Sequence, residues 1–123
     1  MVSEAPHRRV AVVDDDFAVR ESLRFLLETA GFAVATYGSA GEYLDAPPDD
    51  VACLLLDQHM PQVTGLELLT RLRQAGAAIK VALMTGSPSA DLERRARELG
   101  VVWVLEKPLS DNRLLDFVAC AVH

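Results

Sequence analysis

The chain has few cysteines and few basic residues, and each shortage excludes a class of protein. Its only cysteines, Cys53 and Cys120, form no CxxC pair or other metal-binding spacing, so we expect two small core residues in a reducing compartment. Lysine and arginine number 12 against 18 aspartates and glutamates. The resulting net charge of −6 argues against a general attraction to nucleic acid or to anionic membranes. We therefore expect no direct binding of nucleic acid by this domain.

The sequence also lacks long hydrophobic runs. No apolar stretch approaches the roughly 20 residues that span a bilayer, and residues 1–9 contain no apolar core of a signal peptide. These absences predict a cytoplasmic protein without a membrane contact. A chain of 123 residues has the usual length of one compact domain, and 50% of its residues are hydrophobic. We expect an N-terminal tail at residues 1–8 and one domain over residues 9–123.

Four short apolar runs each end beside a residue that is used in phosphoryl chemistry. They are residues 10–13 before three aspartates, 51–56 before Asp57, 81–84 before Thr85, and 101–105 before Glu106 and Lys107. Continuous apolar runs of this length are typical of strands that are buried on both faces of a parallel sheet. The carboxyl ends of parallel strands lie along one edge, so these polar residues should converge there.

Between the apolar runs, hydrophobic residues follow helical spacing. Val19, Leu23 and Leu27 share one helical face, and Gly31 ends that pattern before a further strand at residues 32–37. The expected starts of the later helices are Ser39, Thr64, Ser87-Pro88 and Ser110. Alternation of strands and helices predicts an α/β fold, a doubly wound parallel sheet of five strands with five helices.

Three consecutive aspartates follow the first apolar run. Adjacent carboxylates repel one another unless a cation lies between them, and hard oxygen ligands with few protein groups suit Mg²⁺. Asp14, Asp15 and Asp16 therefore indicate a divalent metal site. The alternative is that one carboxylate caps the first helix while the others are solvated, and Asp16 is best placed for that cap.

Asp57 follows an apolar run and precedes Met60-Pro61, which places its carboxylate at a strand end beside a rigid turn. It could be a simple turn residue. A carboxylate can instead attack phosphorus when a metal and cations neutralise the incoming oxygens. Thr85 would then donate a hydrogen bond to one phosphoryl oxygen, and Lys107 would supply a positive charge to another. Taken singly, a helix cap and a surface lysine would explain these two residues equally well.

Together, these motifs resemble the receiver domain of bacterial two-component response regulators. The matching segments are, in order, Asp14-Asp15, Asp57 with Met60-Pro61 and Gly65, Thr85-Gly86, and Lys107-Pro108. The resemblance covers the chain from Arg9 onward, and it implies the flavodoxin-like strand order 2-1-3-4-5 of the related chemotaxis regulator. The triplet 106–108 is also similar to receivers of the nitrogen-fixation regulator type, whose full proteins carry a DNA-binding domain.

The resemblance implies that a sensor histidine kinase phosphorylates Asp57. It further implies that Mg²⁺ is held by Asp15 directly, by Asp14 largely through water, by Asp57 and by the backbone carbonyl of His59. Thr85 and Lys107 would bind the phosphoryl oxygens and move toward them. We expect this movement to alter the surface of the fourth helix, fifth strand and fifth helix, and to promote homodimerisation or partner docking there.

One position departs from the family pattern. Most receivers have an aromatic residue three positions before the lysine, but here that position is Val104 and the nearest aromatic residue is Trp103. Neighbouring residues of a strand point to opposite faces, so Trp103 cannot replace the missing aromatic side chain.

Two other functions compete with this interpretation. Asp14 and Asp16 also resemble the nucleophile and acid of haloacid-dehalogenase-type phosphatases, but that mechanism leaves Asp57 unexplained and needs a further acidic motif beyond the lysine. A receiver that binds a partner without being phosphorylated is the other alternative. The complete set of site residues argues against it.

Overall fold

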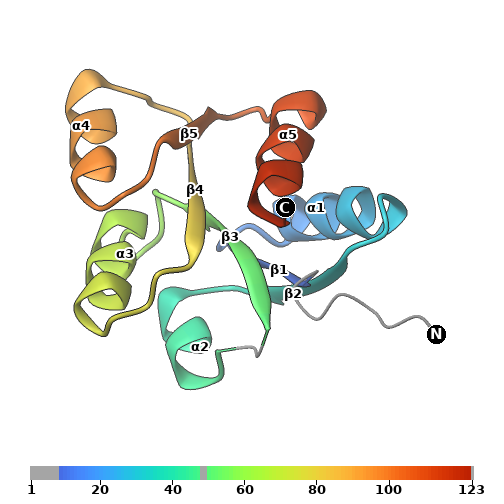
Figure 1. Ribbon diagram of the computed structural model, residues 1–123, viewed down its shortest axis with the longest axis horizontal. Helices are drawn as coiled ribbons and strands as arrows, with labels where there is room; N and C mark the ends of the chain where they lie inside the picture. The colour runs from blue at the N-terminus through green and yellow to red at the C-terminus, as the bar shows by residue number, and fades with distance from the viewer. Residues whose placement is uncertain (1–8, 48–49, 123) are drawn as a thin grey trace.

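The computed structural model describes residues 9–47 and 50–122, so the tail predicted at residues 1–8 and the last residue lie outside the described chain. Five strands alternate with five helices in this part of the molecule (Figure 1). The strands are β1 (Arg9–Val13), β2 (Ala33–Tyr37), β3 (Val51–Asp57), β4 (Lys80–Thr85) and β5 (Trp103–Glu106). The helices are α1 (Phe17–Thr29), α2 (Ala40–Asp45), α3 (Gly65–Gln74), α4 (Ala90–Glu98) and α5 (Asp111–Val122).

The strands form one parallel sheet in the order β2-β1-β3-β4-β5. This confirms the predicted fold class and the strand order that the resemblance implied. The order reverses its direction at β1, so the chain leaves β1 and β3 toward opposite faces of the sheet. Such a switch point opens a crevice beyond the carboxyl ends of these two strands, where α/β proteins bind their ligands.

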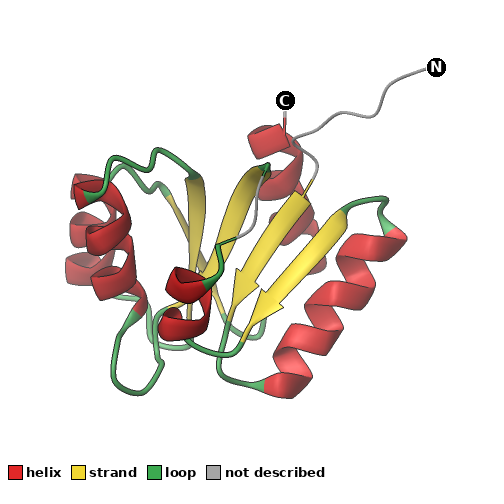
Figure 2. Ribbon diagram, turned by 90° about the horizontal axis from the view of Figure 1, so that it is seen from below, coloured by secondary structure: helices red, strands yellow, loops and turns green. Residues whose placement is uncertain are grey.

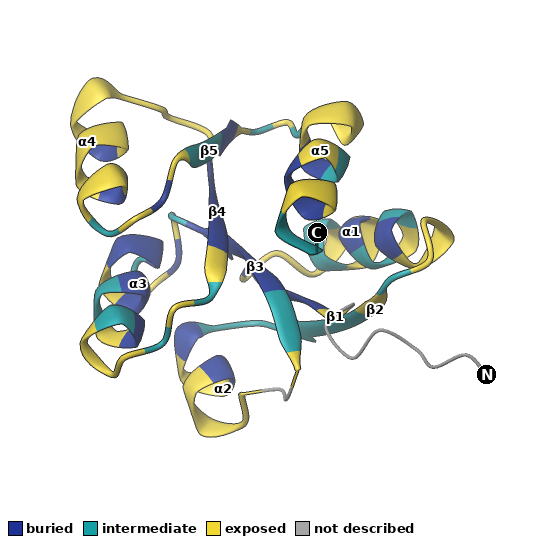
Figure 3. Cartoon of the chain, in the orientation of Figure 1, coloured by how far each residue is buried: buried dark blue, intermediate teal, exposed yellow. Residues whose placement is uncertain are grey.

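Alternate residues of each central strand face two separate hydrophobic cores. Val12 and Leu55 belong to the core under α1 and α5, whereas Val13 and Leu56 belong to the core under α2, α3 and α4. Helices cover both faces of the sheet (Figure 2), and burial follows the strands and the inner faces of the helices (Figure 3). Burial on both faces explains why these strands are uninterrupted apolar runs. None of the helices in the described ranges is long and apolar enough to cross a membrane.

Two local predictions were wrong. Helix α4 begins after Ser89, whose Oγ accepts the Leu92 N–H at 3.0 Å, so Ser87-Pro88 precedes the helix instead of starting it. Ser89 provides a better cap because its side chain can accept this bond. Cys120 is exposed because the buried face of α5 is formed by other residues, which are Leu114, Phe117 and Val118. Cys53 is buried as predicted, and its burial raises the thiol pKa to about 12.

Candidate functional site

Four strands bring the predicted site residues to one edge of the sheet. Asp14 follows β1, Asp57 ends β3, Thr85 ends β4 and Lys107 follows β5. The backbone pairing continues past the strands, because the Gln58 N–H donates to the Met84 carbonyl at 2.9 Å and the Lys107 N–H donates to the Thr85 carbonyl at 2.8 Å. The parallel register therefore fixes the positions of these side chains relative to one another.

Three carboxylates form an acidic cluster at this edge. Asp14, Asp15 and Asp57 each place an oxygen within 4.8 Å of the oxygens from the other two. Asp14 and Asp57 are buried, with 0% and 2% of their surface exposed, whereas Asp15 is exposed. Asp16 points elsewhere, because its Oδ1 accepts the N–H groups of Ala18 and Val19 at the start of α1. The predicted capping role of Asp16 is thus confirmed.

Lys107 lies between the two buried carboxylates. Its Nζ is 2.8 Å from Asp14 Oδ2 and 3.2 Å from Asp57 Oδ1. Burial works to lower the pKa of Lys107, but its hydrogen bonds and charge interactions with the two aspartates outweigh this effect and raise the pKa above its ordinary value. Lys107 is therefore a charged member of the site and not a solvated surface lysine.

Asp57 carries a charge that its surroundings disfavour. Burial is the main cause of its raised pKa, and the nearby Asp14 carboxylate adds to the effect. Lys107 and the His59 N–H, which donates to Asp57 Oδ1 at 3.3 Å, oppose this increase without cancelling it. A further positive charge would favour the ionised form of Asp57.

The donor set fits a divalent cation. Asp14, Asp15 and Asp57 supply three negative charges and Lys107 supplies one positive charge, which leaves a deficit that a divalent ion balances. Carboxylate oxygens are hard ligands that Mg²⁺ and Ca²⁺ prefer. Exposure of Asp15 leaves room for the waters that Mg²⁺ usually retains.

Thr85 presents a buried hydroxyl with two hydrogen-bond partners. Its Oγ1 accepts the Ser87 N–H at 3.0 Å and lies 2.9 Å from Nε2 of the His59 ring. The sequence indicated only the backbone carbonyl of His59 as a site group, and this ring contact was missed. The sequence held only an indirect signal for this contact. The pairing of β3 with β4 extends through Gln58, so the next residue, His59, lies beside the end of β4.

Gly65 allows the start of α3 to pack against the end of β3. A Cβ atom at this position would lie 2.6 Å from the Asp57 carbonyl oxygen and 2.9 Å from Leu83 Cδ1. The Gly65 N–H donates to the Gln58 carbonyl at 3.1 Å, and the Gln58 side chain accepts the Leu66 N–H at 2.9 Å. A side chain larger than hydrogen would displace the backbone that carries Asp57.

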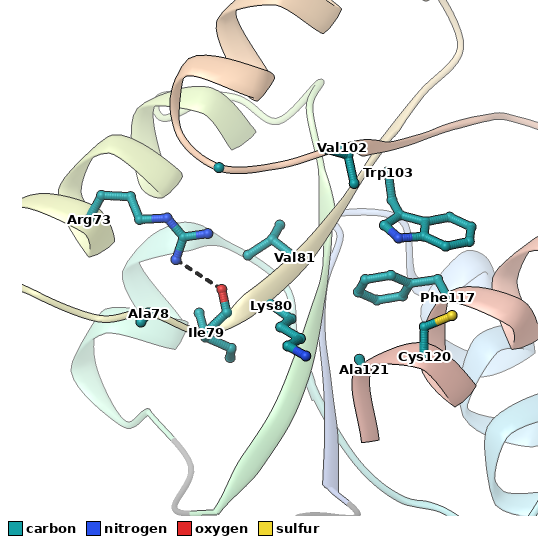
Figure 4. Close-up of a pocket in the computed structure, with 11 residues that line it drawn as sticks. Arg73, Ala78, Ile79, Lys80, Val81, Val102, Trp103, Phe117, Cys120 and Ala121 are labelled. Carbon is teal, nitrogen blue, oxygen red and sulfur yellow. Dashed lines mark hydrogen bonds between the residues drawn. The ribbon is translucent and has the colours of Figure 1, made fainter. Parts of the chain in front are cut away.

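Trp103 and Val104 face opposite cores, as predicted. Trp103 makes an edge contact with Phe117 of α5, with ring centroids 5.7 Å apart, and the Arg113 guanidinium lies 5.9 Å from the indole centroid. Val104 packs instead with the core under α3 and α4. Trp103 and Phe117 also line a cavity of about 290 Å³ at the amino end of β4, the end opposite Thr85 (Figure 4).

Comparisons with known proteins agree with this fold. The family model of the response regulator receiver domain matches residues 10–119, and the chain belongs to this family. It is 45% identical to the transcriptional regulatory protein FixJ of Azorhizobium caulinodans over 114 residues, which are 92% of this chain and 54% of that protein. The chain spans about half the length of the curated relatives it matches, 54% and 56% for the two FixJ proteins.

Solved structures extend the agreement. The FixJ-N crystal structure is 35% identical, with a TM-score of 0.81 over 93% of this chain and 92% of that one. The chemotaxis protein CheY4 of Vibrio cholerae has a TM-score of 0.83 over 92% of this chain and 97% of that chain, and its 23% identity supports the fold alone. The chain thus contains a receiver domain of the FixJ type, which confirms the resemblance. Receiver domains act as phosphoacceptor switches and are phosphorylated by histidine kinases.

The competing functions gain no support. The phosphatase alternative requires Asp16 as an acid beside Asp14, but the Asp16 side chain caps α1 and Asp14 is engaged with Lys107. The alternative of a non-phosphorylated module offers no reason for a buried Asp57 in an acidic cluster.

Proposed function

We propose that this domain accepts a phosphoryl group from a sensor histidine kinase onto Asp57. The observation that carries the proposal is the position of Asp57, whose buried carboxylate lies in the acidic cluster and 3.2 Å from the ammonium group of Lys107. Asp14 is a weaker candidate because its two oxygens already accept bonds from Lys107 and from the Asp16 N–H. The domain catalyses only its own phosphorylation and dephosphorylation.

Mg²⁺ is the cofactor that we propose for this reaction. Asp14, Asp15, Asp57 and the backbone carbonyl of His59 would hold it. When bound, the ion neutralises charge on the incoming phosphoryl oxygens and so lets a carboxylate approach them. The charge deficit of the acidic cluster supports this assignment.

Thr85 and Lys107 would complete the binding of the phosphoryl group. Lys107 is held by Asp14 and Asp57, so it can pass one of its hydrogen bonds to a phosphoryl oxygen without leaving the site. The Thr85 hydroxyl would donate to a second oxygen. Because Thr85 ends β4, its movement would be transmitted to the loop before α4.

The output of the switch is proposed from the relatives. They are named transcriptional regulatory proteins, and we propose that phosphorylation of this domain controls transcription through a partner or another protein segment. The net charge of −6 disfavours direct DNA contact by the domain itself.

We propose that the phosphorylated domain dimerises or docks through the α4-β5-α5 surface. We propose the cytoplasm as the compartment of this domain, in keeping with its membership of the response regulator receiver family.

A labelling experiment tests the proposal. The protein is incubated with acetyl phosphate and Mg²⁺, and the mass added per chain is measured for the wild type, Asp57→Asn and Asp16→Asn. Stoichiometric addition to the wild type and to Asp16→Asn, with none to Asp57→Asn, is expected. Addition that persists in Asp57→Asn would move the acceptor to another carboxylate and overturn the proposal.

A further inference from the structure

His59 is an exposed residue, and its ring reaches across from the loop after β3 to the end of β4. Its Nε2 lies 2.9 Å from Thr85 Oγ1, and the backbone N–H of the same residue donates to Asp57 Oδ1 at 3.3 Å. His59 therefore contacts both the proposed phosphoacceptor and the hydroxyl that is expected to respond to phosphorylation. Among the described residues, the hydrogen bonds of Thr85 Oγ1 go to His59 and Ser87 and not to Asp57.

These two bonds restrict what the Thr85 hydroxyl can do. A hydroxyl has one hydrogen to donate and two lone pairs, and the Ser87 N–H already occupies one lone pair. If the neutral ring accepts at Nε2, it takes the only hydrogen that Thr85 can donate. If the ring donates from Nε2, it fills the second lone pair and leaves the hydroxyl hydrogen free. In either tautomer, the bond to the ring must break or lengthen if Thr85 is to move away from His59.

Phosphorylation would weaken the other contact of His59. An acyl phosphate no longer has the negative carboxylate that accepts the His59 N–H, and hydrogen bonds to charged acceptors are the stronger ones. The hydrogen bond that joins this loop to Asp57 would then be weaker. Phosphorylation of Asp57 thus alters a backbone contact of the same residue whose ring holds Thr85.

We infer that His59 is a positioning residue that holds the Thr85 hydroxyl in the unphosphorylated arrangement and so sets how readily the switch changes state. The inference rests on the proposed function of Asp57. Loss of one net hydrogen bond in a two-state equilibrium shifts it by about fivefold. His59→Ala should therefore favour the rearranged state by about that factor. A ligand that selects this state should bind correspondingly more tightly.

The test measures binding of beryllofluoride, a phosphoryl mimic, by calorimetry in the presence of Mg²⁺. The proteins are the wild type, His59→Ala and His59→Gln, together with Thr85→Val, the His59→Ala/Thr85→Val double variant and Asp57→Asn as the control for the acceptor. We expect about fivefold tighter binding by His59→Ala and near-wild-type binding by His59→Gln, whose amide nitrogen can reach the position of Nε2. His59→Ala should have no effect when Thr85 is replaced by valine, because the two residues act as a pair.

Each other outcome has a defined meaning. An equal gain with and without the Thr85 hydroxyl would show that His59 only limits access to Asp57, and it would overturn the inference. Unchanged or weaker binding by His59→Ala would also overturn it. If the wild type fails to bind beryllofluoride, or if Asp57→Asn binds it equally well, the proposed function itself is wrong.

Discussion

Lys107 Nζ lies 2.8 Å from Asp14 Oδ2, although the two residues are 93 positions apart in the chain. The same ammonium group lies 3.2 Å from Asp57 Oδ1, so one cation serves two buried carboxylates while Asp15 adds a third negative charge nearby. The site is therefore short of positive charge. This shortage leads to the first two predictions.

Asp15→Ala should abolish labelling by acetyl phosphate, because Asp15 is a proposed ligand of Mg²⁺ and Lys107 alone cannot neutralise the incoming oxygens. Asp15 is exposed, so its replacement should leave the fold intact. Phosphate incorporation is measured by mass spectrometry, with Asp16→Asn as the matched control. Excess chelator should stop labelling of the wild type, and undiminished labelling in chelator would remove the metal from the mechanism.

Asp57→Asn should raise the melting temperature of the metal-free protein at neutral pH by several degrees. The pKa of Asp57 in the folded state is raised above its ordinary value of 3.8, so the folded protein holds this proton more tightly than the unfolded chain does. The stabilisation of the folded protein by this tightly held proton is complete below pH 3.8 and is lost as the pH rises through the raised pKa of Asp57. Ionised Asp57 therefore lowers stability at neutral pH, and asparagine avoids that cost.

The advantage of Asp57→Asn should shrink as the pH falls toward 3.8. Thermal unfolding in chelator, recorded at a series of pH values for both proteins, measures this difference. A lower melting temperature for Asp57→Asn at neutral pH would mean that the carboxylate is a structural hydrogen-bond acceptor.

Gly65→Ala should destabilise the domain by about 1–3 kcal/mol, the usual cost of forcing an extra group into a packed site. The added methyl group would meet the Asp57 carbonyl oxygen at 2.6 Å. Gly41 in α2 is a matched control, because the nearest atom to its added Cβ is Ser39 Oγ at 3.8 Å. Gly41→Ala should be neutral or stabilising by about 0.5–1 kcal/mol. Urea unfolding measures both effects, and equal effects at the two positions would contradict the packing argument.

Lys107→Ala should still accept a phosphoryl group but about tenfold to a hundredfold more slowly, which is the rate equivalent of one lost hydrogen bond to a charged group. The variant should also fail to transmit the change, because Lys107 is one of the two proposed contacts to the phosphoryl oxygens. Labelling rates and phosphorylation-dependent self-association are measured in parallel. Normal association by fully labelled Lys107→Ala would limit this lysine to a role in the chemistry.

Beryllofluoride should alter the fluorescence of Trp103 and increase the sedimentation coefficient of the protein. Trp103 is the single tryptophan, and it lies on β5 against Phe117 and Arg113, within the surface that we expect to respond. Asp57→Asn provides the control, because it should show neither change. If neither emission nor mass changes while Asp57 is fully occupied, the α4-β5-α5 surface is not the output route.

Much of the fold could be predicted because its signals are local. Continuous apolar runs followed by helical periodicity specify strands buried on both faces, and Thr64 with Glu67 forms the capping box that starts α3. The start of α4 was misplaced because Ser87-Pro88 and Ser89 are both acceptable starts locally. Only the packing of the helix in the folded domain decides that it begins after Ser89.

The sequence by itself determined the fold class and the four strand ends that carry Asp14, Asp57, Thr85 and Lys107, since both follow from the order of apolar and polar residues. The tertiary structure alone decided which atoms meet: Lys107 with two aspartates, and the His59 ring with Thr85. These contacts depend on the register between strands distant in sequence and on the side-chain conformations that the surrounding packing allows. No local sequence pattern specifies the strand register or these side-chain conformations.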